Sequence, residues 1–202
     1  MSDITPTRSA VIALREERRA MQEGYVFLDE KCLLLAGTMV RELRAFETAE
    51  AGLRALLADA RAALAGAIAR HGLQELQCYP SPVTADIAIE TSTHSLLGVA
   101  LIDAVTRSEL AARPAPVYES PEADACRDTF GALTARLATM AAISGNLERL
   151  YREYRRSVRR VRALQDVLLP EIDRDLCEIE AQLEDLEQDE ALQRARGAIA
   201  YL

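Results

Sequence analysis

The side chains most often used for chemistry are few and widely spaced in this sequence. It has only two histidines, His71 and His94, and its cysteines stand apart from one another: Cys32, Cys78, Cys126 and Cys177. Without a C-x-x-C pair, the cysteines are typical of free thiols in a reducing compartment rather than of a disulfide framework or a zinc site. Because the partners of a histidine metal site or catalytic triad are missing, we expect both histidines to be surface or structural residues.

Motifs for nucleotide and metal chemistry are also missing. There is no G-x-x-x-x-G-K-[ST] phosphate loop, no G-x-G-x-x-G turn and no H-E-x-x-H pair. Acidic pairs are frequent, but on exposed helices they are normally solvated and lack the enclosed pocket that shifts a pKa. We therefore expect no catalytic residues, no bound cofactor and no metal.

One cluster of basic residues stands out in a chain whose net charge is −8. Six arginines fall between positions 152 and 162, where Glu153 is the one acidic residue: Arg152, Arg155, Arg156, Arg159, Arg160 and Arg162. They are either a solvated helix face or a contact surface for an acidic protein partner, since guanidinium groups bind carboxylates in bidentate fashion. The overall negative charge makes RNA a less favoured partner.

The apolar pattern predicts two long helices. From Val11 to Met39, apolar residues recur at alternating steps of three and four, and after a stutter near residue 41 the pattern continues to Ala67. A second series carries on to Leu186 with a stutter near residue 174, and its first part is the following: Cys126, Phe130, Leu133, Leu137, Met140, Ser144, Leu147, Tyr151, Tyr154, Val158 and Val161. Pro170 interrupts it and predicts a kink or a loosened turn.

Helices of this length must pair with each other or with partners, because a 65-residue helix is roughly 100 Å long. We expect one antiparallel two-helix coiled-coil hairpin. Two features suggest the register: the stutters near 41 and 174 would fall level, and basic residues near the start would face the acidic residues of 171–190. These basic residues are Arg8, Arg15, Arg18 and Arg19.

The middle of the chain has a different character, with five of the seven prolines between Gly72 and Pro121. Ile87, Ile89 and Thr91 alternate with other residues as in a half-buried strand, and Leu96–Val105 could form the returning strand. We expect a small β-hairpin or α+β knob at the far end of the coiled coil. The predicted organisation is an all-α-dominated fold with an N-terminal helix over 7–72, a central knob over 73–121 and a C-terminal helix over 122–198.

Composition excludes several classes of protein. The longest apolar runs reach about half of the ~20 residues that a membrane span needs. The N-terminal residues show no apolar signal core after a basic stretch. Half of the residues are hydrophobic, yet the chain has no Trp and three Phe, as suits helices with little interior. A soluble, cytoplasmic protein is expected.

Two segments resemble the D subunit of V-type and archaeal-type rotary ATPases. Near the N-terminus the matching positions are Pro6-Thr7-Arg8, then Gly24, Phe27-Leu28 and Lys31, the one lysine of the chain. The C-terminal match is Arg159-Arg160-Val161-Arg162-Ala163-Leu164-Gln165 with Pro170 after it, similar to the family's R-R-V-N-A-L-E segment. Arg162 and Gln165 depart from the Asn and Glu that are usual at these positions.

The resemblance implies a non-catalytic central-stalk subunit. In that family the helical hairpin inserts into a hexamer of catalytic and non-catalytic nucleotide-binding subunits, with a small stalk subunit and a subunit linking the stalk to the membrane ring as further partners. The chain would be cytoplasmic and peripheral at the inner membrane, and it would transmit torque between ATP turnover and ion translocation. The alternatives are a prefoldin-like chaperone subunit, which also combines two helices with a β-hairpin, and a generic coiled-coil scaffold.

Overall fold

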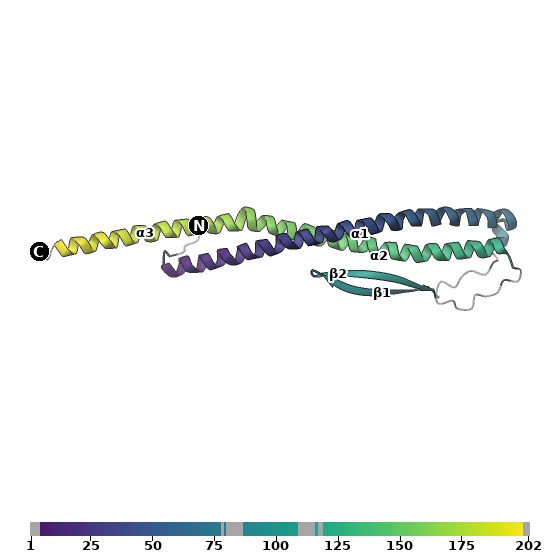
Figure 1. Ribbon diagram of the computed structural model, residues 1–202, viewed down its shortest axis with the longest axis horizontal. Coiled ribbons are helices and arrows are strands. Elements are labelled where there is room, and N and C mark those ends of the chain that lie inside the picture. Colours follow the sequence, from purple (N-terminus) through teal and green to yellow (C-terminus); the bar gives the residue numbers. More distant parts are fainter. Residues whose placement is uncertain (1–4, 78, 80–86, 109–115, 117–118, 200–202) are drawn as a thin grey trace. The chain divides into compact units, whose positions relative to one another are not determined.

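The computed structural model describes residues 5–77, 79, 87–108, 116 and 119–199 of the chain. Within these ranges the elements, labelled in Figure 1, are α1 (Arg8–Gln77), β1 (Ile87–Leu96), β2 (Val99–Ser108), α2 (Pro121–Ala163), the π-helix η2 (Leu164–Leu168) and α3 (Leu169–Ile199). This confirms the predicted fold class, a mostly helical protein with a long antiparallel helical hairpin and a small two-stranded sheet. Much of the predicted knob, at 78, 80–86, 109–115 and 117–118, lies outside the described residues.

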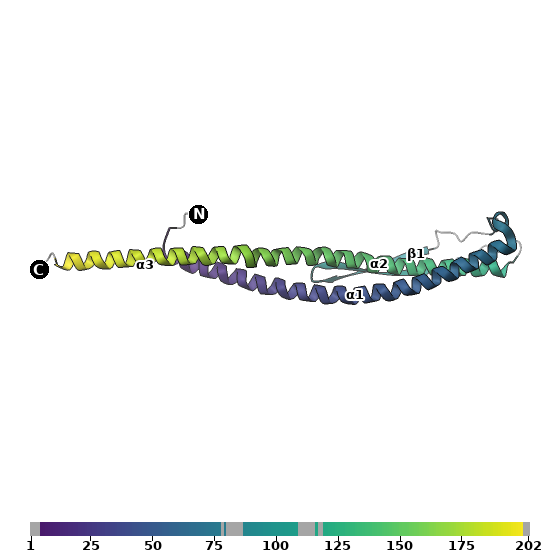
Figure 2. The ribbon, with the colours of Figure 1, turned by 90° about the horizontal axis from the view of Figure 1, so that it is seen from above.

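The chain forms two compact units, and the division falls within α1 and α2. The terminal unit consists of Met1–Leu34 and Tyr154–Leu202, and the central unit of Leu35–Glu153. In the terminal unit α1 runs beside α3, and in the central unit α1 runs beside α2, antiparallel in both cases (Figures 1 and 2). Each unit is therefore built on one pair of helices.

Helix α1 has a capped start and is interrupted at Gly72. Thr7 caps its first turn, since the Thr7 Oγ1 accepts a hydrogen bond from the Ala10 N–H at 3.2 Å. At the other end Gly72 has φ 74° and ψ 162°, outside the helical range, and a last short turn follows to Gln77. Glycine takes up this left-handed φ without the steric penalty that other residues incur, and it therefore produces the break.

The core of the terminal unit lies between α1 and α3. Val11 and Leu14 pack with Ile172, Leu176 and Ile179, and all five are less than 9% exposed. Every member of this cluster belongs to one of the two predicted apolar series. The packing of the two series against each other therefore follows the heptad pattern in this unit.

Ion pairs fix the register of the terminal unit. Arg8 Nη2 donates to Glu187 Oε1 at 2.6 Å, Arg15 pairs with Glu180, and Arg18 pairs with Asp173. The predicted facing of basic and acidic residues is confirmed for these three arginines, whereas Arg19 pairs with Glu23 of its own helix. The predicted alignment of the two stutters is wrong, because Arg18, and not residue 41, lies opposite the residues near 174.

In the central unit the predicted core positions of α2 are partly wrong. Leu150 is fully buried, while its neighbour Tyr151, assigned to the apolar series, is 49% exposed. Ser144 is exposed and Asn146, two residues further on, is 4% exposed. Leu150 has no polar atom to solvate, and the Tyr151 side chain can keep its hydroxyl in water, so burial selects the leucine.

The β-hairpin has the shortest common connection. Leu96 pairs with Val99, which leaves Leu97 and Gly98 as a two-residue loop with φ of 52° and 83°. Positive φ at both positions is the mark of a type I′ turn, whose twist matches that of the strands. Gly98 therefore lies in the turn, and the returning strand starts at Val99 rather than at Leu96 as expected.

The buried side of the hairpin and its place in the fold differ from the prediction. Ile89, expected on a half-buried face, is 56% exposed, whereas Val99 and Leu101 of β2 are 6% and 3% exposed. The hairpin does not sit at the far end of the helices, because Ile102 of β2 binds Asn146 of α2. Asn146 lies roughly 37 Å along the helix from Pro121. A strand edge needs partners for its backbone groups, and the Asn146 side chain supplies them for the N–H and C=O of Ile102.

Candidate partner-contact surface

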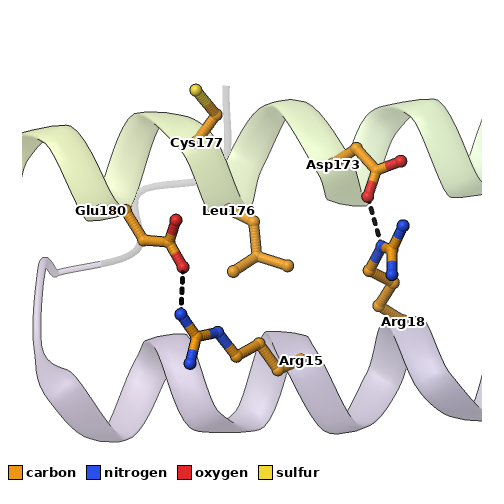
Figure 3. Close-up of a pocket in the computed structure, with 6 residues that line it drawn as sticks. All are labelled: Arg15, Arg18, Asp173, Leu176, Cys177 and Glu180. Carbon is orange, nitrogen blue, oxygen red and sulfur yellow. Dashed lines mark hydrogen bonds and ion pairs between the residues drawn. The ribbon is translucent and has the colours of Figure 1, made fainter.

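In the terminal unit, the facing sides of α1 and α3 form a groove of about 410 Å³ (Figure 3). Arg15 Nη2 donates a hydrogen bond to Glu180 Oε1 at 2.7 Å, and Arg18 Nε donates one to Asp173 Oδ1. Leu176 lies between these two ion pairs and is 8% exposed. All four charged groups of the groove are held in pairs between the helices, an arrangement that favours one register and leaves none of them as an isolated acid or base.

The arginine cluster is exposed along its whole length. In the terminal unit, five of its members are exposed: Arg155, Arg156, Arg159, Arg160 and Arg162. On the same stretch of α2, Ser157 and Val161 are 1% and 9% exposed, so they form the packed side of the helix. The arginines cover the remaining sides, where their guanidinium groups can reach another protein.

Arg152, in the central unit, is also exposed but has a partner in its own helix. Its Nη2 pairs with Glu148 Oε1, one turn earlier, while the side chain remains 71% exposed. An exposed i,i+4 pair of this kind contributes about 0.3–0.5 kcal/mol and can exchange partners easily. Arg152 therefore remains compatible with the predicted contact role.

The N-terminal motif positions have mainly structural places. Thr7 is the cap of α1, next to a half-buried Pro6, and Arg8 pairs with Glu187. Gly24 is half-buried, and a Cβ added there would meet no atom within 4 Å, so no close approach requires a glycine. Lys31 is half-buried and takes part in an interaction of its own.

The C-terminal motif ends in the π-helix. Val161 is buried and Ala163 is the last residue of α2, after which η2 starts at Leu164. The Leu169 N–H donates to the Leu164 carbonyl oxygen, five residues back, as in a π-helix. Pro170 follows directly, and because proline has no N–H the helix cannot keep its regular hydrogen bonds there. The predicted loosened turn is confirmed and lies just before the proline.

The sequence pattern missed the clamp between β2 and α2. Asn146 Oδ1 accepts the Ile102 N–H at 2.8 Å, and Asn146 Nδ2 donates to the Ile102 carbonyl oxygen at 2.9 Å. Arg149 Nη1 donates to the same Oδ1 at 3.0 Å and holds the amide in place. A signal was present, since Asn146 is an isolated amide among the apolar and small residues from 140 to 147 of a long helix.

A second polar contact closes the other end of the central unit. Ser120 caps α2, because its Oγ accepts the Ala123 N–H at 3.2 Å, and His71 Nε2 lies 2.6 Å from the same Oγ. Arg70 pairs with Glu122 beside it at 3.5 Å. His71 thus has a structural place between the end of α1 and the start of α2. His94 is exposed and pairs with Asp103 across the hairpin.

The cysteines show no grouping in the part of the chain that is described. Cys32 and Cys126 are buried, Cys177 is exposed, and Cys78 lies outside the described residues. Burial raises the pKa of the Cys32 and Cys126 thiols. Among the described residues, no cluster of His, Cys, Asp and Glu could hold a metal ion, and none of the described helices is apolar over a length that could cross a membrane.

Comparison with known proteins decides the family. The family described as the D subunit of ATP synthase matches residues 10–196, nearly the whole chain. The chain belongs to this ATP synthase D-subunit family. Relatives named as the D subunit of V-type ATP synthase include one from Thermotoga neapolitana, 24% identical over 96% of both chains, and one from Deinococcus radiodurans, 26% identical over 92% of this chain and 84% of its own. Another, from Deinococcus deserti, is 24% identical over the same shares of the two chains. The resemblance to the D subunit is confirmed, in preference to the chaperone and scaffold alternatives.

Proposed function

We propose that this chain is the rotor shaft in the central stalk of a V-type ATP synthase. It would transmit torque between ATP turnover in a hexamer of catalytic and non-catalytic subunits and ion movement through a membrane ring. Its further partners would be a small stalk subunit and a subunit that links the stalk to the ring. The observation that carries this proposal is the family match over residues 10–196.

The paired helices suit a shaft that carries torque without performing catalysis. In the terminal unit, an apolar core and three interhelical ion pairs resist sliding of α1 along α3. Each exposed pair contributes under about 1 kcal/mol, so the core supplies most of the stability and the pairs supply the register. A peripheral position at the membrane, through the complex, follows from the same role.

The exposed arginines would act as an electrostatic bearing against acidic loops of the surrounding subunits. Arg155, Arg156, Arg159 and Arg160 are all exposed on one stretch of α2. A charged surface can slide past successive acidic loops because solvated ion pairs are individually weak. Salt screens such pairs, with a Debye length of about 8 Å at physiological ionic strength.

The test replaces these four arginines with glutamine in the assembled complex. Coupled ATP turnover should fall, and the effect of added salt on the remaining activity should shrink. The matched control replaces four other exposed arginines with glutamine: Arg44, Arg54, Arg61 and Arg136. If the first variant assembled and turned over like the control, the bearing proposal would be wrong.

A further inference from the structure

Helix α1 carries a second group of apolar side chains in the terminal unit, away from its packed side. Val26, Phe27, Leu33 and Leu34 are 46%, 63%, 68% and 58% exposed, and we call them the apolar strip. The second two residues follow the first two by seven positions, so all four lie along one side of a helix that turns about 100° per residue. Single exposed apolar residues are ordinary, but a contiguous group marks a contact surface.

The apolar strip lies opposite the side of α1 that is packed. Cys32 is 8% exposed, and Met21 packs against the core formed by α1 and α3. At about 100° per residue, both of these positions face away from the apolar strip. Helix α1 therefore presents apolar residues on two opposite sides, as a helix does when it lies between two others.

The charges on the centre line of the apolar strip are acidic, and those at its two edges have opposite signs. Glu23 and Glu30 lie along the centre line and are exposed, and Arg19 pairs with Glu23 at the N-terminal end. Asp29 and Lys31 lie about equally far from the centre line on opposite edges, so together they favour neither sign. Charges next to the apolar contacts of paired helices select the partner. The two glutamates on the centre line therefore favour a basic helix over an acidic one.

We propose that residues 23–34 of α1 bind an amphipathic helix of another protein. The apolar side of that helix covers the apolar strip, and its Lys or Arg side chains reach Glu23 and Glu30. A second copy of this chain fits poorly, because pairing two such strips brings the same acidic residues together. The inference goes beyond torque transmission and does not depend on it.

A photo-cross-linking experiment on the full chain in its native complex tests the occupant. p-Benzoylphenylalanine replaces Phe27 and, in a control chain, Leu192, which is 56% exposed on α3. The Phe27 position should cross-link to one helical segment of another subunit that carries Lys or Arg, and the Leu192 position should not reach that segment. Cross-links to a second copy of this chain, to an acidic or non-helical segment, or to nothing would overturn the proposal.

A binding measurement then tests the chemistry of the contact, using the cross-linked segment as a synthetic peptide and the full chain. Combined Glu23→Lys and Glu30→Lys changes should weaken binding at least tenfold, and so should combined Phe27→Ser and Leu34→Ser changes. The control, Glu184→Lys with Asp185→Lys on the exposed part of α3, should leave the affinity unchanged.

An equal affinity in all variants would contradict the proposal. Circular dichroism checks that each variant keeps its helices. We expect the helices to be kept, because the substituted residues lie outside the core. A failure of this test leaves the rotor proposal intact, since rotation is measured separately.

Discussion

Replacing Asn146 with leucine should release the β-hairpin from α2 without unfolding the helices. Asn146 is 4% exposed and supplies both hydrogen bonds to Ile102, at 2.8 and 2.9 Å. Leucine has a similar size and a higher helix propensity, so α2 itself should not be weakened. The change removes two hydrogen bonds of about 1 kcal/mol each, and the docked hairpin should lose about 2 kcal/mol.

Hydrogen exchange at the Ile102 amide reports this loss directly, because Asn146 is the acceptor of that N–H. A loss of about 2 kcal/mol corresponds to roughly 30-fold faster exchange. The control is Ser144→Ala, at an exposed position of the same helix. The exchange rate at Ile102 in the Asn146→Leu chain could instead stay within about twofold of the control, far below the expected increase of roughly 30-fold. That result would show that Asn146 does not hold the hairpin and would refute the reasoning.

Three further predictions concern the core, the turn and the thiols. Leu150→Ala should lower the free energy of unfolding by about 3 kcal/mol, because Leu150 is fully buried. Tyr151→Ala should lower it by under about 1 kcal/mol, because Tyr151 is half exposed. Equal losses for the two variants in urea titrations would mean that Tyr151 belongs to the core after all. Leu97→Asn should stabilise the hairpin by about 1 kcal/mol, because asparagine tolerates the positive φ at this position. Gly98→Ala should destabilise the hairpin by about 1–2 kcal/mol, because alanine does not tolerate the positive φ there. Hydrogen exchange of the cross-strand amides measures both changes. At pH 8 iodoacetamide should modify Cys177 at least about tenfold faster than Cys32 or Cys126, because the buried thiols have raised pKa values and react as thiolates. Because folding raises the pKa of these two thiols, the free energy of unfolding should fall as the pH rises from the pKa of the unfolded thiols to the pKa of the folded thiols, and it should then stay level. A melting temperature that stayed constant across this pH range would contradict the prediction.

The heptad pattern predicted the fold where hydrophobicity alone decides packing. Val11 and Leu14 meet Ile172 and Leu176 as expected, and all four are buried. The pattern failed on α2, where Leu150 and Tyr151 are adjacent and both apolar. A period of three and four cannot choose between neighbours, and the choice depends on the solvation of the tyrosine hydroxyl.

The register and the clamp needed information of other kinds. The predicted helix ends, Gly72 and residue 122, already implied that the residues near 18 face those near 173, and the stutters misled because a stutter changes local winding rather than pairing. Asn146 stood out in the sequence as an isolated amide, but its partner could not be assigned, because that partner is the backbone of Ile102 and backbone groups carry no sequence signal. The arginine cluster was predictable as a charged surface, because arginine side chains are seldom buried.

Rotation of this chain within the complex is the most direct test of the rotor-shaft proposal. The hexamer would be fixed to a surface, and a bead would be attached to a cysteine introduced at Leu73, which is 60% exposed, in a chain whose four native cysteines are replaced by alanine. Addition of ATP should turn the bead continuously in one direction, and removal of ATP should stop it. A bead that stayed still while the same complexes hydrolysed ATP at the normal rate would contradict the account.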